Sequence, residues 1–397
     1  MTRPLPIDPV QVSACSAVSA YGLGLEALAQ GLAANRSALR PNDLPEVALP
    51  TWIGRVDGLE ALPWSEPEWD CRATRLAWAG LQGDGFEAAV ASARSRHGAA
   101  RVGLVLGTSA STIAASEQAY RSLAADGGFP PALRHEALNT PHALCAFVQR
   151  RLRLEGPALT VSTACSSGAQ ALAVAERWLR LGLADAVVAG GVDALGASLL
   201  HGFHALQVLG EAPCRPFDAA RHGINIGEAA AWLLLEPGRG EVMLLGHGAS
   251  NDAHHMSSPH PQGLGAERAL DDALARAGLD AAALDFVNLH GTATQANDAV
   301  EAALVARRCR ADVHACATKG LTGHTMGAAG ALEALVCVLA LQRGLLAGSA
   351  PTTEPDAAFG AGFAARWRAG PAQRRVRSAA SHSFGFGGNN AVLVFGC

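Results

Sequence analysis

The sequence predicts a layered α/β fold built from two similar halves. Short apolar runs alternate along the chain with longer Ala/Leu-rich stretches whose apolar residues follow helical spacing. Apolar residues make up 49% of the 397 residues and charged residues only 17%, which indicates a large buried interior. Because a chain of this length is too long for one small core, we expect two domains or one large duplicated α/β unit.

The first half supplies a series of strands and a helix. One strand is expected at residues 101–106 and a second at 158–162, and the second leads directly toward Cys165. Apolar positions then follow helical spacing from residue 166 to about 181. Strand character returns at 185–189, just before two glycines.

The second half repeats this pattern after a turn-rich break, EPGRG, at residues 236–240. A new α/β series opens at 242–246 and continues with a strand at 286–289. A helix is expected to begin near Thr325, and the last strand lies at 391–395.

Two short stretches suggest that the halves are duplicated. CSSGA at 165–169 and HTMGA at 324–328 both precede Ala/Leu-rich helices, and their Gly and Ala match in register. Two identities in Ala/Gly-rich sequence make a weak repeat. We predict an N-terminal half at 1–240 and a C-terminal half at 241–397.

Composition excludes several classes of protein. The net charge is −4 and no basic run is present, so nothing favours a nucleic-acid partner. The first twenty residues lack the pattern of a signal peptide, and no uninterrupted apolar run is long enough to span a bilayer. The nine cysteines are scattered and never spaced as CxxC, so we expect reduced thiols in a cytoplasmic protein.

Cys165 lies where a buried strand meets a helix. The unpaired N–H groups and the positive dipole end of a helix favour a thiolate over a thiol at such a position. Small neighbours leave room for a substrate. The local sequence therefore allows either a reactive nucleophile or a packed core cysteine.

Two histidines are further candidates. His290 follows a predicted strand and precedes polar residues, where α/β folds place catalytic groups, although a turn could also satisfy it. His324 lies at a predicted helix N-terminus. There the helix dipole opposes protonation, so we expect a neutral imidazole that donates one hydrogen bond.

Two loops could bind ligands. SFGFGGNN at 383–390 can point backbone N–H groups at an anion, but it leads into a strand, whereas a nucleotide-phosphate loop leads into a helix. NDAHHMSSPH at 251–260 gathers one aspartate and three histidines. Their spacing matches no common zinc pattern, so we expect no metal.

The chain has one lysine, Lys319, among 31 basic residues. Codon bias and chance would explain a lone lysine in an arginine-rich chain. A site that needs one compact ammonium group would explain it as well.

Taken together, these stretches resemble one family, the β-ketoacyl-acyl carrier protein synthases of types I and II in the thiolase superfamily. The motifs that carry the resemblance are VSTACSSG, CRPFDAARHGINIGEAA, HGTATQAND, KGLTGHTMGAAGALEA and SFGFGGNN. Similarity extends from SAVSAYGLGLEALAQGLAANRSALR near the start to the end of the chain. It implies a thiolase fold, in which two duplicated α/β halves form a five-layered α-β-α-β-α arrangement.

The resemblance implies an acyltransferase that performs a decarboxylative Claisen condensation in fatty acid, polyketide or polyene chain elongation, with no metal or redox cofactor. Cys165 would carry the acyl chain as a thioester. His290 and His324 would assist decarboxylation of malonyl-carrier protein by stabilising the enolate. Lys319 occupies the family's catalytic lysine position and would organise the histidines and a carboxylate such as Glu333.

Other positions match the family as well. The oxyanion of the tetrahedral intermediate would bind to the backbone N–H groups of Cys165 and Phe386. The substrates are carried on the phosphopantetheine of an acyl carrier protein, whose surface is acidic. The residues implied to bind these substrates are Thr292, Thr294, Phe384 and Gly387. Asp298, like Glu333, is implied to be a structural residue near the site.

Two departures from the family pattern mark a divergent branch. RHGINIGEAA at 221–230, with His222, stands where RDGFVLGEGA is usual, and KGLTGH replaces the commoner KSxxGH. Both variants leave the catalytic set unchanged. With HMSSPHPQG, they are similar to synthases of aryl-polyene or xanthomonadin-type pigment pathways.

The resemblance also defines alternatives and partners. A thiolase would need a second catalytic cysteine in a C-terminal CxG-type loop, and Cys397 stands without one. A catalytically silent chain-length factor would lack the nucleophilic cysteine. We expect a homodimer or a heterodimer with a chain-length-factor homologue, and docking of acyl carrier protein near Arg72 and Arg75.

Overall fold

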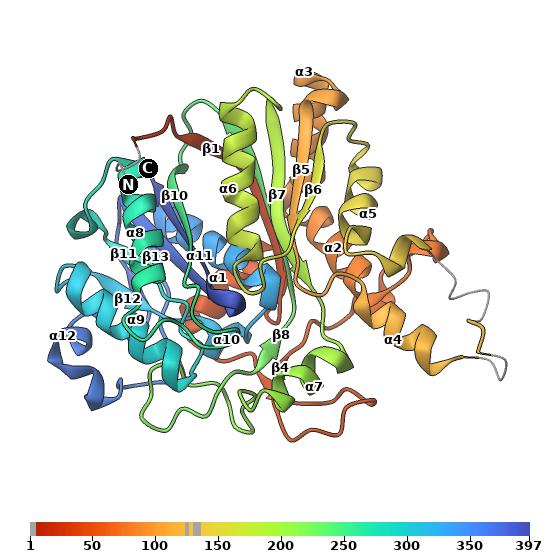
Figure 1. The fold of residues 1–397 in the computed structure, drawn as a ribbon. Coiled ribbons are helices and arrows are strands. Elements are labelled where there is room, and N and C mark those ends of the chain that lie inside the picture. The colour runs from red at the N-terminus through yellow and green to blue at the C-terminus, as the bar shows by residue number, and fades with distance from the viewer. Residues whose placement is uncertain (1–4, 124–126, 130–135) are drawn as a thin grey trace.

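The computed structural model describes residues 5–123, 127–129 and 136–397 (Figure 1). One large sheet runs through this part of the chain. Its N-terminal strands are β1 (Val10–Ser19), β5 (Val102–Gly107), β6 (Ala158–Val161), β7 (Ala186–Asp193) and β9 (Ala229–Pro237). Its C-terminal strands are β10 (Met243–Asn251), β11 (Phe286–Asn288), β12 (His314–Cys316), β15 (Ser378–Gly385) and β16 (Asn389–Gly396).

The two sets of strands share one topology. The strand order is β12-β11-β15-β16-β10 on one side and β6-β5-β7-β9-β1 on the other. If the five strands of each set are numbered in chain order, both sets have the same spatial order: third, second, fourth, fifth and first, from the outer edge to the junction between the sets. The sets meet only where β1 pairs with β10 through Val10–Leu244 and Gln11–Met243. The fold is therefore a duplicated α/β unit, as predicted.

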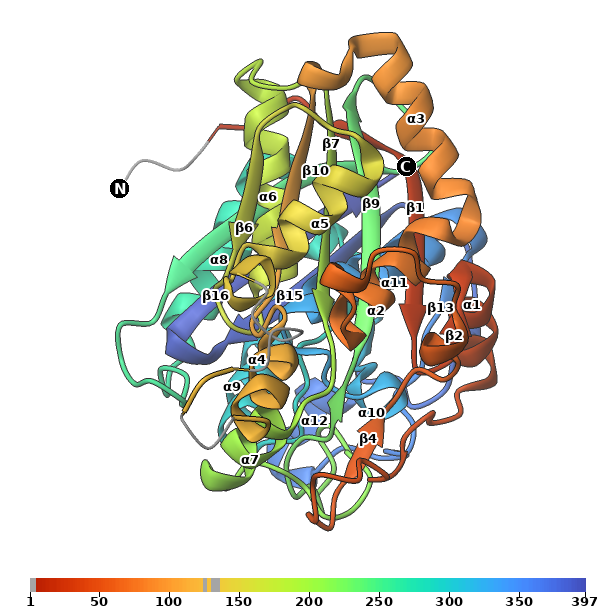
Figure 2. The same ribbon diagram turned by 90° about the vertical axis from the view of Figure 1, so that its right-hand side faces the viewer.

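Helices form three layers around these two sets of strands. α6 (Ser167–Arg180) and α11 (Ala329–Arg343) pack against each other between them. α2 (Arg72–Gln82), α3 (Phe86–His97) and α5 (Ala143–Leu152) cover the outer face of the N-terminal set (Figure 2). α8 (Leu264–Ala277) and α9 (Gln295–Arg308) cover the outer face of the C-terminal set. The predicted five-layered thiolase arrangement is confirmed.

β9 illustrates why the sheet is buried on both faces. Its sequence, AAAWLLLEP, is apolar over almost its whole length. Leu233 and Leu235 belong to the core between the two sets of strands, whereas Trp232 and Leu234 belong to the core beneath the outer helices. A strand covered by helices on both sides requires this continuous apolar character.

Two glycines allow the central helices to approach closely. A Cβ atom on Gly168 would lie 2.7 Å from the backbone nitrogen of Ala331, and one on Gly330 would lie 2.6 Å from that of Ala169. Non-bonded heavy atoms do not approach this closely, so any side chain at these positions would push α6 and α11 apart. The crossing fixes the starts of the two helices relative to each other.

The predicted elements are present with small shifts at their ends. The strands expected at 101–106, 158–162 and 185–189 are β5, β6 and β7. The helix expected near Thr325 begins as a 3-10 turn, Met326–Ala328, and continues as α11. The predicted division at residue 240 falls in the connection between β9 and β10.

One helical segment within the described residues, Met326–Arg343, is long and apolar enough to cross a membrane, with a mean hydropathy of 1.4. The segment contains Glu333 and ends at Arg343, so it is not an uninterrupted apolar run of the kind that the sequence analysis excluded. Because 89% of the segment is buried inside the protein, we assign it to the core as the central helix α11.

Candidate active site

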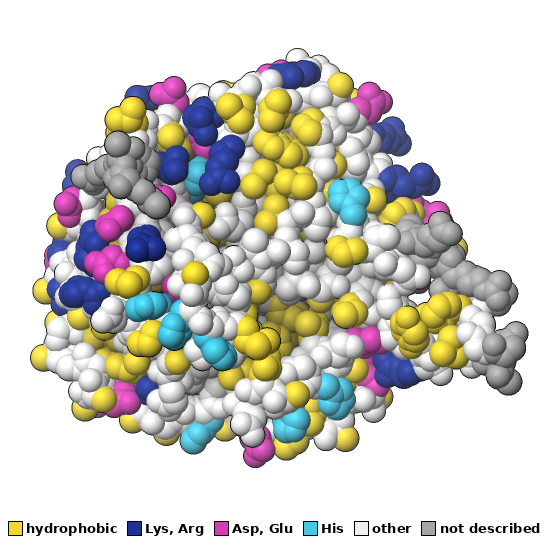
Figure 3. All heavy atoms as spheres, in the orientation of Figure 1, with side chains coloured by type: hydrophobic (Ala, Val, Ile, Leu, Met, Phe, Trp, Pro, Cys, Tyr) yellow, Lys and Arg dark blue, Asp and Glu magenta, His cyan; other side chains and the backbone are white. Residues whose placement is uncertain are grey.

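The two halves place their loops around one cavity of about 390 Å³. Cys165 follows β6 and precedes α6, and His290 follows β11. His324 lies between α10 (Lys319–Thr322) and the turn that leads into α11. All three side chains line the cavity, and the surface of this face is hollowed near its centre, with hydrophobic side chains inside (Figure 3).

Cys165 is held as a buried thiol. All nine cysteines are free, as expected, and Cys165 is 6% exposed. Burial raises the pKa of its thiol to about 11, and the charge of Lys319 and a hydrogen bond from the backbone N–H of Phe386 lower this pKa by less. Burial therefore opposes the thiolate that the helix N-terminus favours, whereas Lys319 and the Phe386 amide act in favour of the anion.

The hydrogen bonds of the two imidazoles fix their tautomers. Nδ1 of His324 accepts the backbone N–H of Met326 at 3.1 Å. Nδ1 of His290 lies 3.3 Å from Nζ of Lys319, which can only donate. A neutral ring that accepts at Nδ1 carries its proton on Nε2. Each histidine thus has an Nε2–H donor available for the cavity that it lines.

Both imidazoles remain neutral at physiological pH. Burial lowers the pKa of His290 and of His324 well below the usual value, and the positive charge of Lys319 acts in the same direction. The predicted neutral His324 agrees with this environment. The ring centroids lie 5.6 Å apart at an interplanar angle of 89°.

Lys319 lies behind the histidines and is almost completely buried. Nζ donates to the backbone oxygen of His290 at 2.5 Å, faces Nδ1 of the same residue, and forms a very short ion pair with Oε1 of Glu333. Three acceptors match the three N–H bonds of an ammonium group. Burial raises the pKa of Glu333 to about 7, and the neighbouring ammonium opposes this rise.

Glu301 supports His290 and was not predicted. Its carboxylate, fully buried, accepts the backbone N–H groups of His290 and Gly291, each at 2.8 Å. Nδ1 of His382 lies 3.0 Å from Oε1 of the same carboxylate. The only sequence signal was an acidic residue three positions after Asp298.

Asp298, expected near the site, positions the threonines and does not line the cavity. Its carboxylate accepts the backbone N–H of Phe217 at 2.7 Å and that of Thr292 at 3.1 Å. Burial raises the pKa of Asp298 to about 7. Thr292 and Thr294 do line the cavity, and their Oγ1 atoms lie 2.8 Å apart.

Asp193, at the end of β7, links the two halves and was also missed. Oδ2 accepts the backbone N–H of Gly327 at 2.6 Å and that of Ser109 at 2.8 Å. Oδ1 accepts the hydroxyl of Thr108 at 2.6 Å and the backbone N–H of Ala110 at 2.9 Å. Burial raises the pKa of this carboxyl. Asp193 thereby joins the end of β5 to the turn that follows His324.

The glycine-rich loop only partly matches its prediction. Phe384 and Phe386 line the cavity, but Gly387 does not. The N–H of Gly387 donates to the backbone oxygen of Met256 at 2.7 Å, and its oxygen accepts from Nδ2 of Asn251 at 2.8 Å. The predicted substrate contact of Gly387 is therefore replaced by a role in anchoring the loop.

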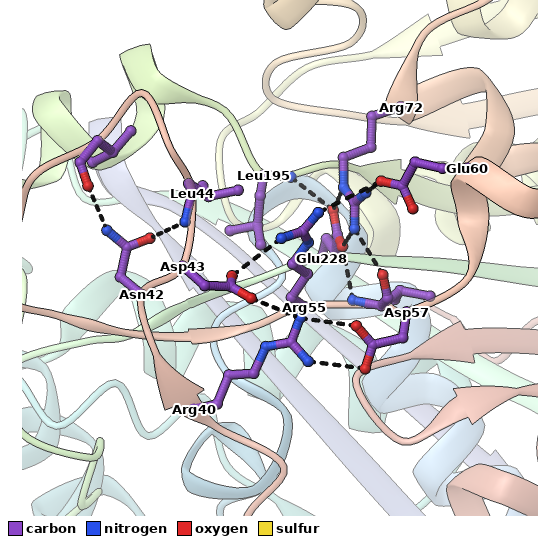
Figure 4. Close-up of polar contacts among 12 residues, drawn as sticks. Arg40, Asn42, Asp43, Leu44, Arg55, Asp57, Glu60, Arg72, Leu195 and Glu228 are labelled. Carbon is purple, nitrogen blue, oxygen red and sulfur yellow. Dashed lines mark hydrogen bonds and ion pairs between the residues drawn. The ribbon is translucent and has the colours of Figure 1, made fainter.

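The arginines expected to dock a carrier protein serve the fold instead. The guanidinium of Arg72 forms ion pairs with the fully buried Glu228 and with Glu60 (Figure 4). Arg75 is paired with Asp70 through two hydrogen bonds. Because both arginines are engaged in ion pairs within the chain, the structure does not support their assignment to docking.

This geometry defines a class of protein: a thiolase-fold condensing enzyme, in which one half supplies a cysteine and the other supplies two neutral imidazoles and an ammonium. The model of the β-ketoacyl synthase N-terminal domain matches residues 71–239, and that of the β-ketoacyl synthase C-terminal domain matches residues 242–353. The chain belongs to the β-ketoacyl synthase family.

Relatives and solved structures agree with this assignment. Nodulation protein E of Rhizobium meliloti (strain 1021) is 37% identical over 309 residues, 75% of this chain and 76% of that protein. The mitochondrial 3-oxoacyl-[acyl-carrier-protein] synthase of Arabidopsis thaliana is 36% identical over 271 residues, 62% of this chain and 58% of that protein. A structure of the ketosynthase ApeO in complex with its chain length factor ApeC, from Xenorhabdus doucetiae, matches with a TM-score of 0.88 and 33% identity over 98% of each chain.

Proposed function

We propose that the protein is a β-ketoacyl-acyl carrier protein synthase that condenses a malonyl group with an acyl group carried on Cys165. The observation that carries this proposal is the meeting of Cys165, His290 and His324 in one cavity, with Lys319 directly behind them. Each of the three steps of such a condensation has a matching group in this site.

In the first step, Cys165 takes the acyl group from its carrier protein. The sulfur attacks the thioester carbonyl, the bond to the carrier sulfur breaks, and the proton of the Cys165 thiol passes to that sulfur, so the carrier leaves as a free thiol. The attack places negative charge on the carbonyl oxygen. The backbone N–H groups of Cys165 and Phe386 are the proposed donors to this oxyanion. In the resting site the amide of Phe386 points at the sulfur, so it already lies next to the reacting atom.

In the second step, malonyl-carrier protein loses CO2. The C–C bond to the carboxylate breaks, and its electron pair forms an enolate whose charge lies on the thioester oxygen. The Nε2–H groups of His290 and His324 are the proposed donors to that oxygen, and they are neutral beforehand. Lys319 keeps the proton of His290 on Nε2 by occupying Nδ1.

In the third step, the enolate carbon attacks the acyl carbonyl on Cys165. A new C–C bond forms, and the cysteine thiolate leaves as the β-ketoacyl product remains on the carrier. The electrons balance without an oxidant or reductant, so we propose that no redox cofactor and no metal is needed. The acyl groups arrive on the phosphopantetheine of an acyl carrier protein, and Thr292 and Thr294 border its proposed path.

We further propose that the chain acts as a dimer. Two similar solved structures are described as a ketosynthase together with a chain length factor, one of them the ishigamide ketosynthase/chain length factor at 28% identity and a TM-score of 0.84. A heterodimer of this kind, in polyene or aryl-polyene elongation, is favoured over a homodimer in fatty acid synthesis. A cytoplasmic location is part of the same proposal.

A catalytically silent chain-length factor is the second candidate, since such a subunit shares the fold. The presence of Cys165 with both histidines argues against it, because a silent subunit needs none of them. A thiolase is less favoured still, because Cys397, which is exposed, has no catalytic loop around it.

Mass spectrometry after incubation with an acyl-carrier protein tests the proposal. We expect an acyl adduct on Cys165, which malonyl-carrier protein then converts into a β-ketoacyl product. Cys15, which is half-buried, and the exposed Cys397 serve as internal controls. An adduct confined to the control thiols, with none on Cys165, would favour the silent subunit.

A further inference from the structure

The C-terminal ends of α6 and α8 meet at one point of β10. Nε2 of His247, on β10, lies 2.9 Å from a carboxylate oxygen of Glu176, near the end of α6. At the preceding position of β10, a Cβ atom on Gly246 would lie 2.6 Å from the backbone nitrogen of Ala277, the last residue of α8. Because successive residues of a strand point to opposite faces, the two helices end on opposite faces of β10 at residues 246–247.

Each of these helix ends carries an arginine without a partner. Arg177 lies in the last turn of α6 and Arg276 in the last turn of α8, and both are half-buried. Neither guanidinium makes a hydrogen bond or an ion pair with any described residue. Nε of Arg276 is buried and has no acceptor. Because a desolvated donor without an acceptor is destabilising, these two side chains fit an acceptor that the described chain does not itself supply.

Helix capping does not account for the two arginines. Basic side chains in the last turn of a helix can donate to its last carbonyl groups. Here backbone donors occupy those groups. The oxygen of Arg177 accepts the N–H of Leu181 at 2.9 Å, and the oxygen of Arg276 accepts the N–H of Ile7 at 2.9 Å. The guanidinium groups therefore remain available for another acceptor.

The neighbouring carboxylates do not neutralise them either. Glu176 is fully buried, and its two oxygens face Nε2 of His247 and Nε of Arg180, the latter at 3.1 Å. Asp272 lies one turn before Arg276 on α8 and forms no ion pair with it. The single nearby carboxylate that is engaged thus serves other groups.

The two unpaired charges act on each other. Burial lowers the pKa of Arg177, and the positive charge of Arg276 lowers it further. Burial also lowers the pKa of His247, against its hydrogen bond to Glu176, and the charges of both arginines act in the same direction as burial. Figure 3 shows basic side chains gathered on this face, in the region where Figure 1 places α6 and β10. The helix ends therefore carry a local excess of positive charge.

We propose that Arg177 and Arg276 together bind a phosphate group. Each guanidinium presents parallel N–H donors, so two of them that approach from different helices can bind two edges of a tetrahedral oxyanion. A carboxylate has only two oxygens, which one guanidinium can occupy alone. A bound phosphate would give the buried Nε of Arg276 an acceptor and would connect the N-terminal half to the C-terminal half. Neither arginine lines the cavity that contains Cys165, so this site is separate from the active site.

Calorimetric titration with inorganic phosphate measures the binding. We expect Kd to rise about tenfold or more in Arg177→Gln and in Arg276→Gln, the size expected when charge-assisted hydrogen bonds are lost. Arg177→Lys, which keeps the charge and loses the fork, should give an intermediate Kd. Arg268→Gln is the matched control, because Arg268 is an exposed arginine of α8 without a described partner. Acetate that binds as tightly as phosphate would contradict the assignment to phosphate.

Thermal unfolding separates a binding role from a structural one. Without phosphate, Arg177→Gln removes one of two repelling charges, so its melting temperature should equal or exceed that of the unaltered protein. With phosphate the order should reverse, because a ligand stabilises the folded protein that binds it. A variant that melts earlier under both conditions and keeps its phosphate affinity would show that Arg177 has a structural role only, and would overturn the site.

Vesicles distinguish a soluble phosphate compound from a lipid headgroup. Binding of inorganic phosphate without co-sedimentation would assign the site to a soluble compound. Co-sedimentation with vesicles of phosphatidylcholine and phosphatidic acid, weakened by the same two substitutions, would assign it to a headgroup. Equal binding of both probes by the unaltered protein and the double variant Arg177→Gln, Arg276→Gln would overturn the proposal, as would binding of neither probe by the unaltered protein.

Discussion

The two halves of the molecule share one topology but place different side chains at equivalent positions. In each half the central helix follows the third strand, with the short helix α10 between them in the C-terminal half. A cavity-lining residue lies at the junction before each central helix: Cys165 before α6, and His324 before the turn that leads into α11. Both junctions contain a non-glycine residue with positive φ, Ala164 at 52° and Met326 at 55°. The duplicated topology therefore provides two equivalent positions beside each other, and the side chain placed there decides the chemistry.

The ends of the second strands show the same division. After β5 the N-terminal half has Thr108, whose turn is held by the buried carboxylate of Asp193. After β11 the C-terminal half has His290, whose turn is held by the buried carboxylate of Glu301. At the end of the second strand, the N-terminal half therefore has the hydroxyl of Thr108, and the C-terminal half has the imidazole of His290. The N-terminal half supplies the sulfur, and the C-terminal half supplies the two imidazoles and the ammonium group, to which we assign decarboxylation in the proposed function.

The largest effect is expected from Lys319→Arg, which removes the compact charge from the C-terminal half. Its three acceptors surround one nitrogen atom, and a planar guanidinium cannot meet them in the same volume. We expect condensation to fall about 100-fold or more, the size seen when one positioned electrostatic group is lost. Steady-state kinetics measures this change, and the melting temperature checks the fold. Arg343→Lys, at an exposed ion pair with Glu26, is the control. Near-normal turnover of Lys319→Arg would remove its proposed role.

Asp193→Asn tests the link between the halves. The new amide N–H groups would face backbone donors that now bind a carboxylate, including Gly327 and Ser109. We expect a loss of about 3 kcal/mol in the free energy of unfolding, because buried donors lose their acceptor. Urea denaturation measures this loss. The exposed Asp271→Asn should stay within about 0.5 kcal/mol, and a similarly small loss in Asp193→Asn would mean that the halves do not depend on this link.

Gly330→Ala tests whether the close crossing of α6 and α11 holds the two junctions in place. The added methyl would overlap the backbone of Ala169, so we expect a loss of about 1–3 kcal/mol in the free energy of unfolding. Gly202→Ala, in α7 (Ala197–Ala205) with no atom within 4 Å of its would-be Cβ, should instead be neutral or stabilising by about 0.5 kcal/mol. Equal effects from both substitutions would contradict the proposed close contact.

The smallest effect is expected from pH. Since the pKa values of His290 and His324 are held well below the usual value, neither ring gains a proton as the pH falls from 8 to 6. The imidazoles should therefore contribute no change in decarboxylation of saturating malonyl-pantetheine over this range, and any change should come from Glu333, whose pKa is about 7, and be absent in Glu333→Gln. A tenfold drop between pH 8 and pH 6 that persists in Glu333→Gln, relative to its own rate at pH 8, would show that at least one imidazole titrates normally.

The sequence was sufficient to predict as site residues those that lie in long motifs: Cys165, His290, His324 and Lys319. The structure places the first three in the lining of one cavity and Lys319 next to His290. β9 was not predicted, because an apolar run such as AAAWLLLEP fits a buried helix as well as a strand. β15 was not predicted either, because its sequence, SAASHSFG, consists largely of small and polar residues. Both strands are defined by their pairing with neighbouring strands, which the local sequence pattern does not show.

Other features depend on distant contacts and could not be read locally. Asp193 and Glu301 are ordinary acidic residues in the sequence, and only the fold brings several backbone N–H groups to each. The pKa of Cys165 follows from burial, which the neighbouring residues do not reveal. Arg72 was assigned to a surface role because its partner Glu228 lies 156 positions away.

The division of labour between the halves is tested most directly by measuring acyl transfer and CO2 release side by side in Cys165→Ala and His324→Ala. The account predicts that Cys165→Ala accepts no acyl group yet still releases CO2 from malonyl-carrier protein. It predicts the reverse for His324→Ala, which should form the acyl adduct and release CO2 at least about 100-fold more slowly. Loss of both activities in both folded variants, or retention of CO2 release in His324→Ala, would contradict it.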